Sequence, residues 1–392
     1  MDGLNLKIGD STMEIIKLRE LADIQTGPFG SQLHKEDYVQ VGTPIVTVEH
    51  LGKRVFTEQN LPHVDNKDKI RLKKYSLLEG DIVFSRVGAI DRSSYVDKEH
   101  EGWLFSGRCL RIRPYRKVYP LYLYYYLQLE RVKSFIRSIA VGATMPSINT
   151  SILGKVNILV PEIAVQKNIA KQMAILDDKI ELSNDLNRKL QQFRQAMLTK
   201  LFPREGAEEP ELHFEGNLNC WKAFRLGDCV DRLDNLRVPV SATNRIAGTT
   251  PYYGANGIQD YVSGYTHEGE FILIAEDGAN DLDNYPIQYV NGRIWVNNHA
   301  HVLQGKPKIV DTKFLKYALS QVDMRFYLVG GSRSKLNSNI MMNIELNLPI
   351  DIDEQRKIGD LLGELDKFIS LQQKKLERMQ RLKAALLEKM FV

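Results

Sequence analysis

The sequence predicts an α/β (α+β) protein in which one arrangement occurs twice: a strand-rich domain followed by a long helix, with the two helices packed as an antiparallel coiled coil. Three observations support this fold class. Two distant segments match each other, both have the heptad spacing of a packed helix, and the stretches before them are short apolar runs broken by turn residues. The expected divisions are a first domain, a helix, a linker, a second domain and a second helix, at residues 1–161, 162–202, 203–220, 221–349 and 350–392.

The internal repeat is clearest over residues 166–202, which match residues 355–391 at a constant offset of 189 positions. Of these 37 positions, 11 are identical, whereas unrelated segments of average composition would share roughly two or three. Just upstream, at an offset of 188, Asn149 corresponds to Asn337. The interiors of the two halves hardly match. The framework is therefore duplicated while the interiors differ, as expected of a protein that does two similar jobs on two different targets.

Each matching segment is expected to be one helix, because its apolar residues keep a 4-3 spacing over about five heptads. At 1.5 Å per residue, such a helix is roughly 55 Å long. Neither helix can bury its apolar stripe alone, so the two are expected to pack together. The Pro-, Gly- and Glu-rich linker leaves the far end of the first helix, which favours an antiparallel pair with an approximate two-fold relation. The predicted seam positions are Ile169, Met173, Leu176, Ile180, Leu190, Met197 and Leu201, and Ile358, Leu362, Leu365, Ile369, Leu376, Met379, Leu386 and Met390.

The two interiors are expected to contain mostly strands, with one helical segment near the end of each domain. Strands are expected at Asp81–Ser85, Leu110–Arg113, Phe271–Ile274 and Arg293–Val296. Helical segments are expected at Pro120–Ile139 and Thr312–Tyr327.

The loops between these elements carry side chains suited to nucleic acid. Arginine, asparagine, glutamine and serine donate and accept hydrogen bonds at base edges, lysine suits phosphates, and glycine lets the backbone approach a duplex. A similar loop recurs in both halves, at residues 142–149 and 330–337. The plainer alternative is that such loops are only turns. The candidate DNA-contacting residues are Thr26, Phe29, Ser31, Gln32, Arg86, Arg92, Thr144, Ser147, Asn149, Tyr252, Tyr253, Asn256, Asn297, Asn298, His299, Ser332, Arg333, Lys335 and Asn337.

The composition is that of a soluble protein of two or more domains. The net charge of +4 and the pI near 8.7 are compatible with nucleic acid. The three cysteines, Cys109, Cys220 and Cys229, lack metal-ligand spacing, which indicates a reducing compartment and argues against a zinc site. The sequence contains no signal-like or membrane-length apolar segment. A cytoplasmic location without membrane association is therefore expected.

Motifs of catalysis are missing from the sequence. It contains no Gly-x-x-x-x-Gly-Lys-Ser/Thr loop of an ATP motor, no Asn/Asp-Pro-Pro-Phe/Tyr motif of an adenine-N6 methyltransferase and no His-Glu-x-x-His. His299 and His301 could form a metal pair, but nothing at suitable spacing completes it, and Glu276 with its acidic neighbours lacks the following lysine of a nuclease site. Asp177 and Asp366, which match in the two helices, are expected to make polar contacts near the helix seam.

The arrangement resembles the specificity subunit of type I restriction–modification enzymes over essentially the whole chain. Besides the duplicated helices, the resemblance lies in five stretches and their order. They are Gly27–Ser31, Gly80–Gly88, Pro251–Gly257, Leu273–Gly278 and the junction from Phe202-Pro203 through Pro210-Glu211-Leu212 to Trp221. It implies a non-catalytic subunit that reads a bipartite double-stranded DNA target, one half-site per domain, with the helix pair fixing the gap. Half-sites read from one side of a duplex lie roughly 34–36 Å apart, a separation that helices of this length can hold.

The resemblance also implies partners and cofactors. Two adenine-N6 methyltransferase (modification) subunits would dock on the helix region and the domains, and restriction/motor subunits would join them. S-adenosylmethionine, ATP and Mg²⁺ are expected on these partners, with no cofactor or metal in this chain. Candidate docking residues on the surface faces of the helices are Lys179, Arg188, Lys374, Lys375 and Arg378.

Two other functions stay open from the residues alone. A coiled-coil scaffold for protein assembly would explain the helices equally well, but it explains the Arg-, Asn-, Gln- and Ser-rich loops less well. An active DNA methyltransferase or nuclease of unusual sequence would need motifs that are missing. Duplex binding separates the scaffold from a DNA-reading subunit, and activity of the pure chain tests the enzyme.

Overall fold

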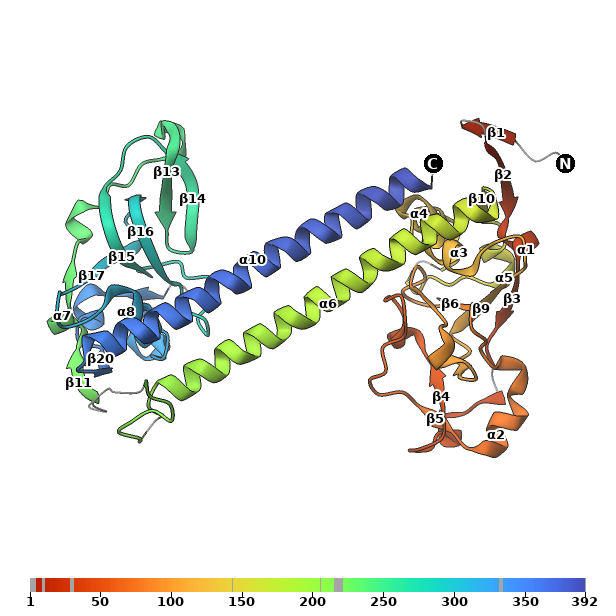
Figure 1. The fold of residues 1–392 in the computed structure, drawn as a ribbon, viewed down its shortest axis with the longest axis horizontal. Helices are drawn as coiled ribbons and strands as arrows, with labels where there is room; N and C mark the ends of the chain where they lie inside the picture. Colours follow the sequence, from red (N-terminus) through yellow and green to blue (C-terminus); the bar gives the residue numbers. More distant parts are fainter. Residues whose placement is uncertain are drawn as a thin grey trace. The chain divides into compact units, whose positions relative to one another are not determined.

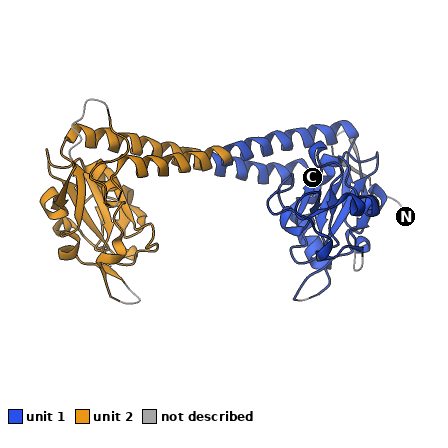
Figure 2. Ribbon diagram, turned by 90° about the horizontal axis from the view of Figure 1, so that it is seen from below, with its two compact units in different colours: residues 1–184, 375–392 blue, residues 185–374 orange. Residues whose placement is uncertain are grey.

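The computed structural model describes residues 5–8, 11–28, 32–142, 144–204, 206–214, 221–330 and 334–391. The chain forms two compact units (Figure 2). Unit 1 comprises residues 1–184 and 375–392, and unit 2 comprises residues 185–374. Because the boundary falls within the two long helices, each helix contributes one part to each unit.

Unit 1 contains small sheets flanked by short helices (Figure 1). Its four-stranded antiparallel sheet has the order β3-β9-β6-β7, and two three-stranded sheets have the orders β5-β4-β8 and β1-β2-β10. The strands are β1 (Asn5–Ile8), β2 (Ser11–Lys17), β3 (Ala22–Thr26), β4 (Thr43–Val46), β5 (His63–Val64), β6 (Ile82–Ser85), β7 (Ser93–Tyr95), β8 (Leu104–Phe105), β9 (Cys109–Pro114) and β10 (Asn157–Val160). The short helices are α1 (Leu18–Leu21), α2 (Asn66–Arg71), α3 (Pro120–Leu127), α4 (Glu130–Ile139) and α5 (Thr150–Leu153).

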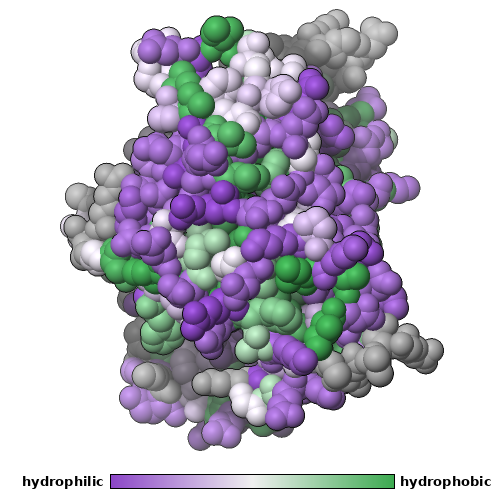
Figure 3. Space-filling model, turned by 90° about the vertical axis from the view of Figure 1, so that its left-hand side faces the viewer, coloured by the Kyte–Doolittle hydropathy of each residue, from purple (hydrophilic) through white to green (hydrophobic). Residues whose placement is uncertain are grey.

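Unit 2 is built on a six-stranded sheet of order β12-β17-β15-β16-β13-β14, with two-stranded ladders β11-β20 and β18-β19 beside it. The face of this unit drawn in Figure 3 is mostly hydrophilic, with small hydrophobic groups between. The strands are β11 (Trp221–Arg225), β12 (Val230–Arg232), β13 (Ala247–Gly254), β14 (Gly257–Val262), β15 (His267–Ala275), β16 (Ile287–Val296), β17 (Ala300–Gly305), β18 (Leu328–Val329), β19 (Lys335–Leu336) and β20 (Glu345–Pro349). The short helices are α7 (Leu226–Cys229), α8 (Thr312–Leu319) and α9 (Ser338–Met341).

The two long helices are α6 (Ile163–Leu201) and α10 (Ile352–Met390), each of 39 residues. All the predicted seam positions are buried or half-buried, as the heptad spacing requires. Within unit 1, Lys383 Nζ lies 2.6 Å from an Asp177 oxygen, and within unit 2, Arg194 pairs with Asp366. Each pair joins an early part of one helix to a late part of the other, so the helices run antiparallel, as predicted.

Each of these two aspartates also accepts a hydrogen bond from a tyrosine of its own unit, one in α3 and one in α8. The Tyr125 hydroxyl donates to Asp177 at 2.8 Å, and the Tyr317 hydroxyl donates to Asp366 at 2.9 Å. Burial and then the adjacent carboxylate raise the pKa of both tyrosines, which keeps each hydroxyl a donor. The predicted polar contacts of these aspartates therefore lie where each domain meets the helix pair.

At the C-terminal end of each long helix, a phenylalanine ring packs against an aromatic ring of the adjoining domain. Phe391 packs with its ring centroid 5.0 Å from that of Tyr122 in unit 1, and Phe202 stacks at 5.5 Å on Phe314 in unit 2. Arg131 also donates to the main-chain oxygen of Phe391. Because Phe202 and Phe391 occupy matching positions of the repeat, the duplication extends to the packing against each domain.

Two predicted helical segments are broken in the structure. Residues 120–139 form α3 and α4, separated at Leu129, which is fully buried and whose ψ of 134° is not helical. Nearly all of α3 is buried whereas α4 buries one face, so a single straight helix could not serve both environments. Residues 312–327 form α8 and a 3₁₀ turn at residues 324–327, because the Asp323 carboxylate accepts from the main-chain N–H of Arg325 and starts a new turn.

Candidate nucleic-acid interface

Unit 1 carries an open groove of about 990 Å³ formed by loops at one end of its sheets. Three of the predicted residues, Arg86, Arg92 and Ser147, line this groove together. The remaining lining residues are Pro28, Leu33, Tyr38, Thr47, Val48, Glu49, Val87, Ser106, Gly107, Arg108 and Met145. Sequence reasoning missed Arg108 and Glu49, because neither lies in a repeated loop or a recognisable motif.

Backbone hydrogen bonds hold the arginine-bearing loops in place. The N–H of Arg86 donates to Arg108 O at 2.8 Å, and the N–H of Ile148 donates to Arg86 O at 2.9 Å. A β-bridge between Val87 and Ser147 joins the same two loops. The loop after β6 is therefore fixed between the turn before β9 and the loop of residues 142–149.

At Gly27, two segments of the chain approach each other closely beside this groove. A Cβ built on it would lie 2.2 Å from Ser106 O, so no larger residue fits without moving the backbone. This contact explains the glycine of the motif at residues 27–31. Phe29 and Ser31, the predicted residues of that motif, lie outside the described residues.

Among the described residues, the other candidates of unit 1 are not part of the groove lining. Thr26 ends β3, and Thr144 is exposed in the loop before Ser147. The Gln32 side chain accepts from the Tyr75 hydroxyl at 2.5 Å, and Asn149 accepts from Ile152 N at 2.8 Å as the N-cap of α5. The side chains of Gln32 and Asn149 therefore already have structural partners.

Unit 2 carries a smaller groove of about 320 Å³, formed by the segment before β13 and by the ends of β14 and β16. Four predicted residues line it together: Tyr252, Asn297, Asn298 and His299. Pro239, Val240, Ser241, Arg245 and Gln259 complete the lining and were not predicted.

The polar side chains of the unit 2 groove are ordered by contacts with one another. The Asn297 amide donates to Gln259 Oε1 at 3.3 Å and its oxygen accepts from His299 N at 2.8 Å. The Arg245 guanidinium lies 4.1 Å from the ring centroid of Tyr252, which is itself buried. Tyr252 thus supports Arg245 and is not itself exposed to a ligand.

The remaining predicted residues of unit 2 are placed apart from this groove. The Asn256 side chain bridges Gly278 O and Asn280 N, at 2.9 and 3.0 Å, and Tyr253 packs half-buried against the sheet. Lys335 is half exposed and pairs with an acidic residue, and Asn337 precedes α9. Ser332 and Arg333 lie outside the described residues.

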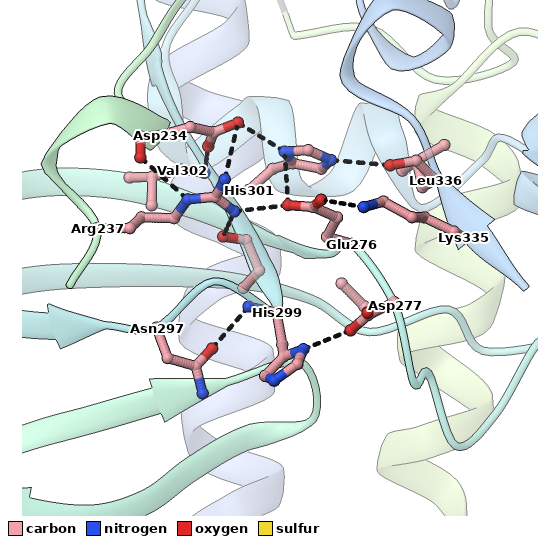
Figure 4. A network of polar contacts seen from close by, with 12 residues as sticks. Asp234, Arg237, Glu276, Asp277, Asn297, His299, His301, Val302, Lys335 and Leu336 are labelled. Atoms are coloured by element: carbon pink, nitrogen blue, oxygen red, sulfur yellow. Dashed lines mark hydrogen bonds and ion pairs between the residues drawn. The ribbon is translucent and has the colours of Figure 1, made fainter. Parts of the chain in front are cut away.

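A buried polar network connects the strands behind the unit 2 groove (Figure 4). His301, only 2% exposed, lies 2.7 Å from Asp234 through Nδ1 and 2.9 Å from Leu336 O through Nε2. Arg237 donates to Glu276 at 2.7 Å, and the Lys335 ammonium lies 2.8 Å from the other Glu276 oxygen.

This network explains the acidic residues that could have indicated a nuclease or metal site. Both Glu276 oxygens are occupied by cations, and His299 contacts Asp277 at 2.5 Å instead of sharing an ion with His301. Within the described part of the chain, no group of three His, Cys, Asp or Glu residues is placed to hold a metal. The cluster therefore positions β15, β17 and β19 relative to one another.

Removal of one carboxylate from this network is expected to destabilise unit 2 in a pH-dependent way. Burial alone would raise the pKa of Glu276, but hydrogen bonds from Lys335 and Arg237 outweigh it and lower that pKa. A depressed folded-state pKa gives stability that is present above the unfolded value and lost as the pH falls through the folded value. Glu276→Gln is therefore expected to lower the free energy of unfolding at pH 7 by about 2–4 kcal/mol.

The measurement is urea unfolding at pH 7 and pH 3.5, followed by tryptophan fluorescence. The difference between Glu276→Gln and the parent chain should shrink once the pH falls below about 4. Asp283→Asn is the matched control, because Asp283 is 80% exposed and pairs only at the surface with Arg325. Equal differences at the two pH values would contradict the expectation.

Comparisons with known proteins cover nearly the whole chain. The model of the family described as "type I restriction modification DNA specificity domain" matches twice, at residues 10–192 and 219–381. A putative type I restriction enzyme specificity subunit of Haemophilus influenzae is 42% identical over 156 residues, a match that spans 40% of this chain and 40% of that protein. A putative type I restriction enzyme specificity subunit of Methanocaldococcus jannaschii is 25% identical over 393 residues, 94% of this chain and 90% of that protein.

Solved structures share the fold. The crystal structure of the S subunit of a type I restriction–modification system from M. genitalium superposes with a TM-score of 0.72 at 18% identity, covering 99% of this chain and 98% of that chain. In the part of the chain that the structure describes, no helix is long and apolar enough to cross a membrane.

These comparisons confirm the predicted resemblance and the predicted fold class. The relatives carry the name of specificity subunits and not of methyltransferases or nucleases, in agreement with the non-catalytic subunit that was predicted. With both halves matched by one family model, the chain belongs to the type I restriction–modification DNA specificity family.

Proposed function

We propose that this chain is the DNA-reading subunit of a type I restriction–modification complex, in which each unit reads one half of a bipartite target. The observation that carries the proposal is one repeated framework bearing two chemically different grooves. The groove of unit 1 has three arginines, and the groove of unit 2 has three side-chain amides and one arginine. Arginine suits guanine and amides suit adenine, so the two grooves fit different sequences.

The helix pair is the proposed docking region for two methyltransferase subunits. Besides the buried seam, each long helix has exposed hydrophobic residues at heptad-like spacing, where solvent alone would favour polar residues. The charged candidates Lys179, Arg188, Lys374, Lys375 and Arg378 are also exposed and lie along these helices. The exposed hydrophobic residues are Ile175, Leu182, Leu186 and Phe193 on α6, and Leu361, Phe368, Leu371 and Leu382 on α10.

In this assembly the chemistry belongs to the partners. S-adenosylmethionine would be bound by the methyltransferase subunits, and ATP and Mg²⁺ by the restriction/motor subunits. The role of this chain is to select the target and to hold the partners over it.

The purified chain alone is therefore expected to show neither methyl transfer nor cleavage. Adenine methylation should appear when a cognate methyltransferase subunit and S-adenosylmethionine are added to a duplex that contains the target. The measurement is incorporation of labelled methyl groups with and without the partner. Methyl transfer by the isolated chain at the rate of the complex would show that it is an enzyme.

A double variant, Leu182→Glu with Leu371→Glu, separates docking from DNA reading in the same assay. The two leucines are 72% and 55% exposed and occupy matching positions of the repeat, so their replacement should leave the fold intact. The variant is expected to retain duplex binding and lose methylation. A parent chain that assembles partner proteins but binds no duplex selectively would instead be a scaffold.

A further inference from the structure

The groove of unit 1 combines unpaired cations with one carboxylate. Arg92 and Arg108 are exposed, and neither side chain has a hydrogen bond or ion pair within the described residues. Glu49 is the single acidic side chain among the described residues that line this groove. The two arginines are therefore available to a ligand, and the carboxylate is present where a polyanion would bind.

Glu49 is held in the groove by its own short turn. It lies in the 3₁₀ turn Val48–His50, and the Thr47 hydroxyl donates to its Oε1 at 3.1 Å. No lysine or arginine pairs with Glu49 within the described ranges. One carboxylate oxygen thus stays open to a hydrogen-bond donor from outside the chain.

The neighbouring histidine does not neutralise Glu49. The N–H of Thr47 donates to His50 Nδ1 at 2.9 Å, so this nitrogen carries no proton, and Nε2 lies 3.2 Å from Gln59 O as a donor. Burial lowers the pKa of His50, which favours the same neutral form. The negative charge of Glu49 is therefore uncompensated.

A carboxylate in this place selects among DNA groups. It repels phosphates, so it weakens binding unless it accepts hydrogen bonds from a base. In the major groove, only the amino groups of cytosine and adenine donate, and arginine donates in pairs to O6 and N7 of guanine. Arg92 and Arg108, which line the same groove as the open carboxylate of Glu49, therefore match the two acceptors and one donor of a G·C pair.

We propose that the groove of unit 1 reads a G·C base pair, with Arg92 or Arg108 bound to guanine and Glu49 bound to the cytosine amino group. This assignment rests on the proposed function and adds the base pair to it. The groove of unit 2 has no acidic side chain among its described lining residues and presents Gln259, Asn297 and Asn298. Glu49 therefore affects one half-site only.

The test uses the complex with its methyltransferase subunits and a duplex of its mapped target. At each G·C pair of both half-sites in turn, cytosine is replaced by 2-pyrimidinone, which lacks the amino group. At one pair the parent complex should lose about tenfold or more in affinity, whereas Glu49→Ala should bind both duplexes equally. In a second arm, 7-deazaguanine at the same pair removes N7, a probe that requires no protein variant.

Glu99→Ala is a matched control within the same unit. Glu99 is the central residue of the 3₁₀ turn Lys98–His100, is exposed and does not line the groove. This variant should discriminate cytosine from 2-pyrimidinone as the parent does.

The outcomes separate the two proposals. A complex that binds its bipartite target but loses equal affinity in the parent and Glu49→Ala, at every G·C pair of both half-sites, would overturn the G·C assignment and leave DNA reading intact. A loss confined to the half-site read by unit 2 would overturn the assignment as well. A complex without any bipartite target would overturn the proposed function itself.

Discussion

Exchange of residues 224–347 for the equivalent segment of a relative is expected to replace one half-site and leave the other half-site and the gap unchanged. The segment begins in β11 and ends in β20, which pair with each other, and Ala223 lies opposite Asn347 in their register. The two ends of the exchanged segment therefore lie next to each other, in the β11-β20 ladder. Affinity for the original target should fall about a thousandfold or more, towards non-specific binding, because one half-site is no longer matched.

The measurement is genome-wide mapping of methylated adenines in cells that carry the hybrid chain with its methyltransferase subunit. The parent chain and the donor relative, mapped in the same host, identify the origin of each half-site. A hybrid in which both half-sites change together would contradict the assignment of one half-site to each unit.

Lengthening the helix pair is expected to lengthen the gap between the half-sites. Four residues add roughly 6 Å of rise and about 40° beyond a full turn, which corresponds to one or two base pairs of B-DNA. The insertion point in α6 is Asn187, a buried residue. Its Oδ1 has no hydrogen-bond partner among the described residues, so the insertion breaks no hydrogen bond of that oxygen. A matching insertion is placed after Gln373 in α10, which lies opposite Asn187 in the register set by the Arg194–Asp366 pair. With both helices lengthened equally, their register does not have to shift.

The readout is again the mapped methylation target. The doubly extended chain should methylate the same two half-sites across a longer gap. Insertion in α6 alone serves as the control, because the unequal helices must bulge and some stability should be lost. An unchanged gap in an active double insertion would mean that the helices do not set the spacing.

The duplicated framework could be predicted because its signals are local and periodic. Seam residues such as Leu176 and Leu365 recur at helical spacing, and the matching of Asp177 with Asp366 placed polar contacts near the seam. Such patterns depend on neighbours in the chain and are read directly from the sequence. The periodicity alone does not give the relative direction of the two helices. That direction was predicted from the position of the linker, and the Lys383–Asp177 and Arg194–Asp366 ion pairs confirm it.

The interiors could be predicted only in part, since their sites combine distant segments. Arg86 and Ser147 were selected from separate loops and meet at one groove, but their contact with DNA stays a prediction. Arg108 and Glu49 join that groove from turns without any sequence signature. Asn149, by contrast, has the composition of a contact residue and serves as a helix cap, because the same amide chemistry suits both roles.

The buried network of unit 2 shows the same limit. Asp234, Glu276 and His301 lie far apart in the sequence, and only the strand order brings them together. The spacing of His299 and His301 was compatible with a metal pair that no third residue completed, and in the structure each histidine contacts its own carboxylate. Pairing of this kind depends on tertiary structure and not on local spacing.

The path of α10 has a consequence for the order in which the chain is made. Unit 1 takes its last helical segment from residues 375–392, and Phe391 fills the space beside Tyr122. A ribosome therefore synthesises all of unit 2 before unit 1 has its complete set of residues. During translation, unit 1 therefore exposes the hydrophobic surface that residues 375–392 later cover. Unit 2 can fold as soon as residue 374 has left the ribosome. Premature termination within the final helix would consequently damage the unit that was made first.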